Sequence, residues 1–401
     1  MKVSGRGSVP PHRFGPFLVR RGDRPALQYL LDHQLAACRR RDRLERWLAG
    51  KALDRGFDRI ALAALVRRYG REAPGPLEVQ GVWVAVRDTL KSCGLSGVRI
   101  GVHKLTDPAG GLGYGAVLIG FGRRGNALEA DHPIVVLKVR PESAGTSGFA
   151  EEAQALAAVR APLPKGLRDL IPVPLAHRST DEFEVLATGY VPGRSLPLDL
   201  TPDALGRIGI RRRMIAVAAT LARLQVGLGH SVDRVADGSV WPEAAGDAPW
   251  SRELRERLAV RPLPLMRVHG GFGPENILCK GHRITGVVGW SHHRSAALPT
   301  EDLFHFLLSF AHLVDRRSRG GAGAIRRVFV ERNRVSRAVR DALLRYGEQR
   351  ELGLPTLDGL LRLHLLVAPS PGGTAQAFRT MDDRLEAVRV LENARETVFT
   401  P

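Results

Sequence analysis

The first quarter of the chain repeats apolar residues at helical spacing. Intervals of three and four residues separate the leucines from Leu27 to Leu35, and the same spacing returns between Leu44 and Tyr69. The turn sequence APGP at 73–76 interrupts the pattern, which resumes from Val79 to Leu90. Residues 1–95 are therefore expected to form an arginine-rich, mostly helical extension.

Near residue 95 the pattern changes from helical to strand-like. Three short stretches rich in β-branched residues, VRIGVHKL (98–105), GAVLIGFG (115–122) and PIVVLKVR (133–140), are bounded by turn residues. A helical stretch at 149–160 and two further strands follow. This order predicts a small antiparallel sheet with a helix packed against it, over residues 96–191.

The remainder of the chain is mainly helical. After PGRS (192–195) the helical spacing continues to the end, except for two short strands around 277–290. The expected fold class is α+β, with a small antiparallel β lobe and a larger helical lobe over residues 192–401. The helical extension at the amino terminus precedes these two lobes.

The 401-residue chain carries a formal net charge of +19, and almost all of the excess comes from arginine. A charge of this size attracts nucleic acid, anionic membranes or phosphorylated ligands. The arginines are scattered, however, and no basic stripe contains interleaved aromatic residues, which argues against a nucleic-acid groove. The preference for Arg over Lys is instead typical of a GC-rich genome.

The cysteines and the amino terminus indicate the compartment. Cys38, Cys93 and Cys279 lie far apart and in no metal-ligand spacing, which argues against a disulfide framework and against a zinc site. The initial MKVSGRGSVPPHRFG lacks the apolar core of a signal peptide, and the chain contains no apolar run long enough to cross a membrane. We therefore expect a cytoplasmic protein without a membrane span.

Three features of the small lobe could bind phosphate groups. Lys138 lies among aliphatic residues on the third strand, where its ammonium group could reach a phosphate or, alternatively, protect a sheet edge. Glu152, or its neighbour Glu151, lies on the following helix and could pair with this lysine or simply be solvated. The glycine-rich turn between the first two strands includes Gly111, Gly113 and Gly115, and glycines there let backbone N–H groups approach a phosphate.

The order of these features is more informative than any one of them. A hinge, YVPGRSL (190–196), and a helix ending in LARLQ (221–225) precede the stretch HGGFGPENILCKGHRITGVVGW (269–290), and LPTEDLFHF (298–306) follows it. In this order the motifs resemble the aminoglycoside phosphotransferase and choline kinase-like family, over about residues 98–310. The resemblance implies a protein-kinase-like fold that binds ATP and phosphorylates a small-molecule hydroxyl group.

The resemblance also assigns roles to individual positions. The family's loop resembles HGDxxPxN, and its second strand ends in Ile-Asp-Trp. His269 would brace the loop, Asn276 would hold a metal ion, and Asp302 would be a buried structural carboxylate. The usual catalytic carboxylate falls at Gly271, and the main magnesium-binding carboxylate falls at Gly289.

The two glycines leave more than one function open. Glycine offers no side-chain oxygen, so the acceptor hydroxyl lacks its base and Mg²⁺ lacks its principal ligand. The leading interpretation is a catalytically impaired pseudokinase that still binds ATP through Lys138, Glu152 and the glycine turn. The alternative is an active ATP-dependent phosphotransferase to an aminoglycoside, sugar or amino alcohol that uses Glu275 instead. His292 and His293 are expected to point opposite ways on an extended segment.

A third interpretation comes from the charge. The basic extension over residues 1–95 could bind nucleic acid or another anionic surface. The sequence names neither the small-molecule acceptor nor a protein partner.

Overall fold

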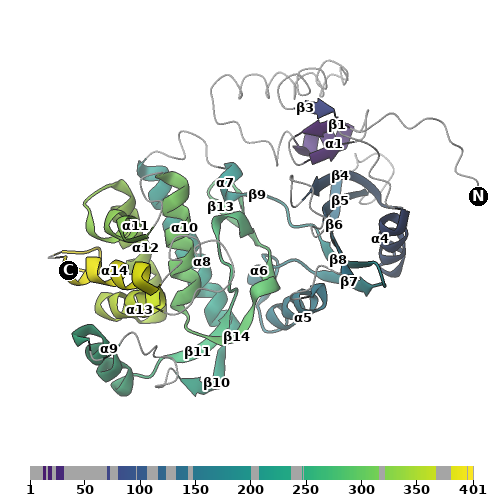
Figure 1. The fold of residues 1–401 in the computed structure, drawn as a ribbon. Coiled ribbons are helices and arrows are strands. Elements are labelled where there is room, and N and C mark those ends of the chain that lie inside the picture. Colours follow the sequence, from purple (N-terminus) through teal and green to yellow (C-terminus); the bar gives the residue numbers. More distant parts are fainter. Residues whose placement is uncertain are drawn as a thin grey trace, which may run out of the picture. The chain divides into compact units, whose positions relative to one another are not determined.

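The computed structural model describes residues 12–14, 17–19, 24–30, 70–72, 80–95, 97–105, 116–122, 132–142, 148–199, 207–235, 246, 248–315, 321–366, 381–394 and 396–400. The chain divides into two compact units. The first comprises Met1–Ala157 and Pro172–Arg194, and the second comprises Ala158–Ile171 and Ser195–Pro401 (Figure 1).

An antiparallel sheet of eight strands, in the order β3-β1-β2-β4-β5-β6-β8-β7, forms the centre of the first unit. The strands are β1 (His12–Phe14), β2 (Phe17–Val19), β3 (Gly70–Glu72), β4 (Arg99–Leu105), β5 (Ala116–Gly122), β6 (His132–Pro141), β7 (Pro174–Ser179) and β8 (Phe183–Gly189). The helices in the described residues of this unit are α1 (Arg24–Tyr29), α4 (Gln80–Ser92) and α5 (Phe149–Arg160), the last of which ends in the second unit.

Strand β6 separates two environments because successive side chains on a strand point to opposite faces. Val135, Leu137 and Val139 are buried and pack with the apolar side of α4, including Val86 and Leu90. Lys138 belongs to the alternate set, on the other face. The sequence pattern of β6 therefore fixes which face of the sheet presents the lysine.

Most elements of the first unit agree with the sequence pattern, and one difference has a physical cause. The five strands and the helix expected between residues 98 and 190 correspond to β4 to β8 and α5. The short strands β1, β2 and β3 were not expected, because three residues are too few to show a period. The helices expected between Leu44 and Tyr69 lie outside the described residues.

Helices dominate the second unit, as expected. They are α6 (Lys165–Arg168), α7 (Leu196–Asp199), α8 (Arg207–Leu228), α9 (Pro249–Val260), α10 (Thr300–Val314), α11 (Gly321–Ile325), α12 (Arg334–Arg350), α13 (Leu354–Leu366) and α14 (Met381–Glu392). Single turns of 3₁₀ helix occur at η5 (Pro274–Asn276) and η6 (Trp290–His292), and a π-helical segment, η8, occurs at Arg326–Val330.

Two small sheets accompany these helices. One has the strand order β10 (His230–Val235), β11 (Pro264–Val268) and β14 (Arg294–Ala297). The other has the order β13 (Arg283–Val287), β12 (Ile277–Lys280) and β9 (Arg194–Ser195). The loop from His269 to Asn276 joins the first sheet to the second.

A buried polar contact fixes the beginning of α10. The Tyr346 hydroxyl on α12 lies 2.7 Å from Gln225 Oε1 on α8 and 3.0 Å from the carbonyl oxygen of Pro299. Gln225 Nε2 donates to the same carbonyl at 2.7 Å. Because buried polar groups are costly unless paired, this arrangement favours one placement of the residues that start α10.

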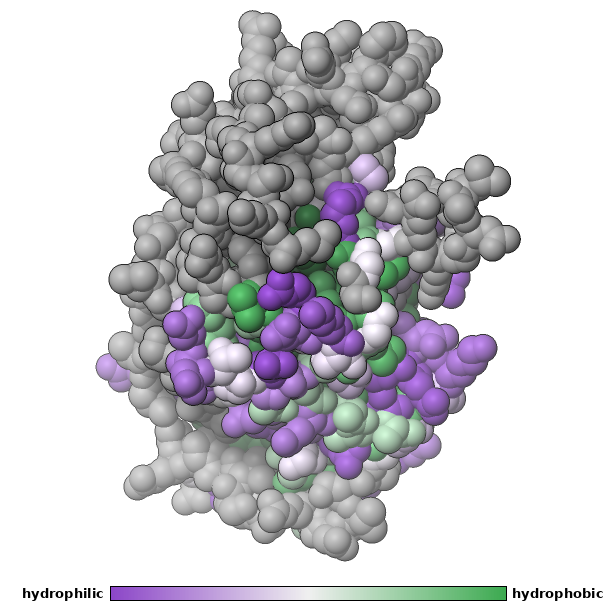
Figure 2. Space-filling view, turned by 90° about the vertical axis from the view of Figure 1, so that its right-hand side faces the viewer, coloured by the Kyte–Doolittle hydropathy of each residue, from purple (hydrophilic) through white to green (hydrophobic). Residues whose placement is uncertain are grey.

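The described residues form a surface of mixed polarity on the face seen in Figure 2. Figure 2 shows hydrophilic side chains surrounding small apolar areas on one face of the molecule. None of the helices in the described residues is long and apolar enough to cross a membrane. Cys93 is a partly exposed free thiol, and Cys279 is buried.

Candidate functional site

Asp302 holds the beginning of the loop that follows β11. The residue lies in the first turn of α10, and its carboxylate accepts hydrogen bonds from the backbone N–H groups of His269 (2.8 Å) and Gly270 (2.9 Å). Burial raises the pKa of Asp302 to about 7, although the two backbone hydrogen bonds act in the opposite direction. The carboxyl group is thus a fixed acceptor for the loop backbone and is not directed to a ligand.

His269 braces the loop as a neutral imidazole. Its Nε2 lies 2.9 Å from the carbonyl oxygen of Val288, and since a carbonyl can only accept, Nε2 carries the proton. Nδ1 is then an acceptor and receives the N–H of Gly271 at 3.2 Å. Burial lowers the pKa of His269 to about 3, and its ring lies 4.5 Å from that of Trp290 between ring centroids. These contacts hold the ring in place.

At Gly271 the backbone would accept a side chain. The residue has no left-handed φ, and the nearest atom to an ideal Cβ position is His292 Cδ2 at 3.4 Å, an ordinary van der Waals contact. His292 and His293 were expected to lie on an extended segment and to point opposite ways. Instead, His292 is the last residue of a 3₁₀ turn, and His293 follows that turn. The imidazole of His292 therefore borders the position where the usual catalytic carboxylate would begin.

At Gly289 the backbone and the neighbouring side chain both disfavour a carboxylate. The residue has φ +80° and ψ 50°, in the left-handed region of backbone conformation that residues other than glycine rarely adopt. An ideal Cβ atom there would lie 2.6 Å from Asn276 Oδ1 and 2.9 Å from Asn276 Cγ. Asn276 Nδ2 donates to the carbonyl oxygen of Gly271 at 2.8 Å. The Asn276 amide thus occupies the space beside Gly289.

The residues of this loop do not fit a magnesium ion. Mg²⁺ requires oxygen ligands in octahedral geometry, commonly one or two carboxylates with phosphates and water. Asp302 is bound to backbone N–H groups, and Glu275 is exposed with its carboxylate folded back toward Gly273. Within the described residues, no group of three His, Cys, Asp or Glu side chains could hold a metal ion.

In the first unit, Lys138 and Glu152 form an ion pair. Lys138 Nζ lies 2.6 Å from Glu152 Oε1 and 2.7 Å from Oε2. The glutamate side chain is 3% exposed and the lysine side chain 26% exposed. Glu151, the alternative partner considered from the sequence, is exposed at the surface of α5. The pairing orients an ammonium group that remains partly accessible to solvent.

A second buried glutamate in this unit was missed by the sequence interpretation. Glu184 on β8 accepts from Arg140 Nε at 2.6 Å and from the backbone N–H of Ala150 at 3.1 Å, and its Oε1 lies 2.8 Å from His177 Nε2. Burial alone would raise the pKa of Glu184, but hydrogen bonds from His177 and Arg140 bring it below its ordinary value. The Glu184 contacts fasten the start of α5, the helix that carries Glu152. The sequence pattern of β8 did not indicate that Glu184 would have this role.

The glycine turn and the hinge are the remaining parts of the small lobe to which the resemblance points. Gly111, Gly113 and Gly115 lie outside the described residues. The hinge YVPGRSL is described, and its Tyr190 ring lies 6.0 Å from that of Tyr29 between centroids.

The strand–loop–strand arrangement, its buried anchoring aspartate and the lysine–glutamate pair of the antiparallel sheet define a kinase-like phosphotransferase scaffold. Residues 127–334 match the phosphotransferase enzyme family designated APH, and the chain belongs to this family. The resemblance and the fold class inferred from the sequence are thereby confirmed.

Solved structures of aminoglycoside and macrolide phosphotransferases are similar to the chain. APH(3'')-Id from Streptomyces rimosus is 16% identical, with 71% of this chain and 99% of that chain covered and a TM-score of 0.36. APH(4)-Ia is 13% identical, with coverages of 78% and 97% and a TM-score of 0.41. Macrolide 2'-phosphotransferase MphH from Brachybacterium faecium is 19% identical, with coverages of 78% and 98% and a TM-score of 0.36. At these TM-scores the similarities establish no detail of the site. A comparison with curated proteins gives no match.

Proposed function

We propose that this member of the phosphotransferase family is a pseudokinase: it binds ATP but does not transfer its phosphate efficiently. The observation that carries the proposal is the Asn276 amide beside Gly289, with Oδ1 2.6 Å from the position of a Cβ atom. Phosphoryl transfer depends on metal ions and positioned carboxylates. The Asn276 amide lies where the main metal-binding carboxylate would be. Gly271, at the position of the usual base, has no side chain.

The rest of the loop supports a loss of chemistry without a loss of fold. Asp302 and His269 hydrogen-bond to backbone groups of the loop, which supports the structural roles proposed for them. Effects of catalytic groups that act as a unit are not additive, so the two glycines together should reduce the rate to about the level reached by losing one. Loss of a general base alone typically costs about 10²- to 10⁴-fold.

Nucleotide binding is supported by the Lys138–Glu152 pair. A buried carboxylate next to the ammonium group keeps the side chain extended and in one orientation. The partly exposed Nζ retains the capacity to meet phosphate oxygens. We assign ATP to Lys138, Glu152 and the turn at Gly111, Gly113 and Gly115, without a tightly held Mg²⁺.

The test measures binding and chemistry separately. Thermal-shift titrations of the full chain with ATP, with and without Mg²⁺, should show stabilisation that Mg²⁺ changes little. Under the same conditions, phosphate transfer to aminoglycosides, sugars and amino alcohols should be absent. Lys138→Met should lose the ATP-dependent shift. Turnover with Mg²⁺ or Mn²⁺ would overturn the proposal, and so would the failure of ATP to stabilise the protein.

One observation favours a second candidate, an active phosphotransferase. The His292 ring lies 3.4 Å from the Cβ position at Gly271, so an imidazole borders the place of the usual base. The alternative based on Glu275 has less support, because that carboxylate faces Gly273. The absent metal ligand still argues against efficient transfer, and we rank this candidate second.

The proposal also covers the cellular compartment of the protein and its binding partners. We place the protein in the cytoplasm on the basis of its sequence, with a small-molecule acceptor or a protein as the partner. Binding of nucleic acid to residues 1–95 is the weakest alternative. A DNA or RNA affinity that falls steeply with salt would support that alternative, and undetectable binding would exclude it.

A further inference from the structure

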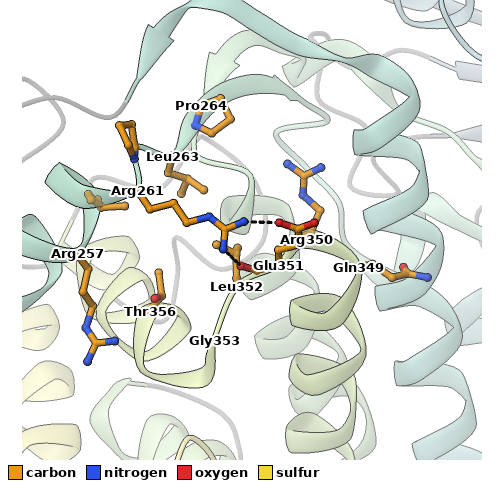
Figure 3. Close-up of a pocket in the computed structure, with 12 residues that line it drawn as sticks. Arg257, Arg261, Leu263, Pro264, Gln349, Arg350, Glu351, Leu352, Gly353 and Thr356 are labelled. Atoms are coloured by element: carbon orange, nitrogen blue, oxygen red, sulfur yellow. Dashed lines mark hydrogen bonds and ion pairs between the residues drawn. The ribbon is translucent and has the colours of Figure 1, made fainter.

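A cavity of about 510 Å³ lies in the second unit, at the opposite end of β11 from the loop just described. It is formed where α9 ends and β11 begins, and where α12 ends and α13 begins (Figure 3). Small-molecule sites commonly have volumes of about 300–1,000 Å³. The cavity is therefore large enough for an organic molecule and larger than an inorganic ion requires.

The charged residues that line the cavity are mainly cationic. Arg257, Arg261 and Arg350 contribute three guanidinium groups, and Glu351 contributes one carboxylate. Arg257 forms an ion pair with Glu253 on its own helix. Arg261 and Arg350 lie on the two chain segments that face each other across the cavity, at the end of α9 and the end of α12.

Arg261 is held by a contact that an anion can replace. Figure 3 shows its guanidinium group meeting Glu351, to which it donates through Nη2, while Nη1 donates to the Glu351 carbonyl oxygen at 3.1 Å. Both side chains are well exposed, at 66% for Arg261 and 75% for Glu351. Exposed ion pairs contribute little net stability, so exchanging Glu351 for a ligand oxygen costs little.

Arg350 has unused hydrogen-bonding capacity. Its Nε is buried without a hydrogen-bond partner, and its Nη2 meets the sulfur of Met266 at 3.7 Å. Thioether sulfur is a weak acceptor, and guanidinium groups bind phosphate or carboxylate oxygens in a fork geometry. An anionic ligand would therefore give the Arg350 guanidinium a stronger hydrogen-bond acceptor than the Met266 sulfur.

The beginning of α13 provides further donors at the same cavity. Gly353 precedes the helix and accepts its first backbone bond, from Leu357 N at 3.0 Å. The first turn contains no acidic residue, and Gly353 has no side chain to cap it. N–H groups in the first turn of a helix have no acceptor within the helix and favour anions. Gly353 and Thr356 of this turn both line the cavity.

Arginines near the ends of α9 and α12 also have a structural explanation, because cations stabilise helix carboxyl termini. That explanation accounts for the bond from Arg261 to the Glu351 carbonyl. It does not account for the unpaired Nε of Arg350, the uncapped start of α13, or the open volume between them.

We propose that this cavity binds a small organic phosphate of about the size of a sugar phosphate. The phosphate has enough oxygens to meet the guanidinium groups of Arg261 and Arg350, and the start of α13 adds the N–H groups of Leu354 and Thr356, since Pro355 has none. The apolar side chains of Leu258, Leu263 and Leu352 line the same cavity and offer contact to the organic part. The proposal does not depend on the proposed pseudokinase function.

Isothermal titration calorimetry of the full chain with ribose 5-phosphate tests the proposal, with ribose and inorganic phosphate in parallel. Saturable binding is expected only for ribose 5-phosphate at low millimolar or lower concentration. Arg350→Gln should weaken it by about tenfold or more, and Glu351→Gln, which frees Arg261, should strengthen it. Opposite effects of two neighbouring substitutions cannot come from a general loss of folding.

Two control variants make the experiment decisive. Arg345→Gln removes an arginine from the exposed side of α12 that does not line the cavity, and it should leave the affinity unchanged. Lys138→Met should also leave it unchanged, which separates this site from the ATP site. Equal binding of inorganic phosphate and ribose 5-phosphate would overturn the proposal. So would an affinity that Arg350→Gln and Arg345→Gln reduce alike, or the absence of saturable binding.

Discussion

The side-chain oxygen of Asn276 lies 2.6 Å from the position that a Cβ atom would take on Gly289. Asn276 is the one expected metal ligand of the loop that has a side-chain oxygen, and its amide is fixed by a hydrogen bond to the Gly271 carbonyl. The absence of a side chain at Gly289 therefore leaves no open metal site. The neighbouring amide fills the space instead, which connects the missing side chain at Gly289 with the position of the Asn276 amide.

Replacing Gly289 by Asp should destabilise the protein. A residue other than glycine in the left-handed region costs about 1–3 kcal/mol, and the contact with Asn276 adds to this cost. Gly281→Asp is the matched control, because Gly281 has φ +63° with no atom within 4 Å of its Cβ position. Urea unfolding should show a larger loss for Gly289→Asp than for Gly281→Asp.

The excess loss should disappear in Gly289→Asp with Asn276→Ala, because truncation removes the overlapping amide. Equal losses for the two glycine substitutions would mean that the Asn276 side chain turns away freely. The amide would then not be a barrier to a metal-binding carboxylate.

Gly271→Asp should be tolerated. Its Cβ position meets no atom closer than 3.4 Å, and its backbone lies outside the left-handed region. The change in unfolding free energy is expected to stay within about 0.5 kcal/mol, as for substitutions that make no new strain. Restored phosphate transfer by this single substitution, measured as ADP release with each acceptor, would show that the base alone was missing. We expect none until Gly289 is also replaced.

The loop and the ion pair could be predicted from the sequence because both depend on spacing. Lys138 follows the alternation of β6, and His269 and Asn276 flank a turn of fixed length. The position of the Asn276 amide could not be predicted, since it depends on a side-chain rotamer and on φ at Gly289. The proximity of His292 to Gly271 was also missed, because an extended segment was assumed where a 3₁₀ turn occurs.

Lys138 and Glu152 should be coupled in stability but separable in ligand binding. Lys138→Met leaves the buried carboxylate of Glu152 without its cation and should reduce the unfolding free energy. Adding Glu152→Leu removes the unpaired charge, so the double variant should recover much of the loss. ATP binding should not recover with it, because the ammonium group is still absent. Chemical denaturation and ATP thermal shifts on the four proteins of this cycle measure both effects. Recovery of ATP binding in the double variant would remove Lys138 from the site.

Buried histidines should make the second unit sensitive to acid. Burial lowers the pKa of His269 to about 3 and the pKa values of His305 and His364 to about 4, below the ordinary 6.5. Between about pH 4 and 6.5 the unfolded chain binds more protons at these positions, so stability is lost as the pH falls. Each histidine contributes up to about 1.4 kcal/mol per pH unit. His305→Gln with His364→Gln should flatten the pH dependence of urea unfolding.

Asp302 should act in the opposite direction. Its raised pKa, about 7 against the ordinary 3.8, means that the folded state holds the proton that the unfolded state releases. Its contribution to stability therefore falls as the pH rises from about 4 to 7. Asp302→Asn removes this opposing effect, and the acid sensitivity should become steeper. A shallower profile in Asp302→Asn would show that the carboxyl group is ionised throughout this range.

Any residual phosphate transfer should depend on His292 and not on Glu275. The His292 imidazole borders the Cβ position at Gly271, whereas the Glu275 carboxylate lies against Gly273 and is exposed. A base must come within hydrogen-bond reach of the proton that it removes, so only the histidine is near the required place.

Prolonged incubation with radiolabelled ATP and the acceptor panel can detect transfer too slow for coupled assays. His292→Ala should abolish such transfer and Glu275→Ala should leave it unchanged, while His293→Ala controls for loss of a neighbouring imidazole. Transfer that disappears only in Glu275→Ala would place the substitute carboxylate on η5 and would contradict both the orientation of that side chain and the pseudokinase proposal.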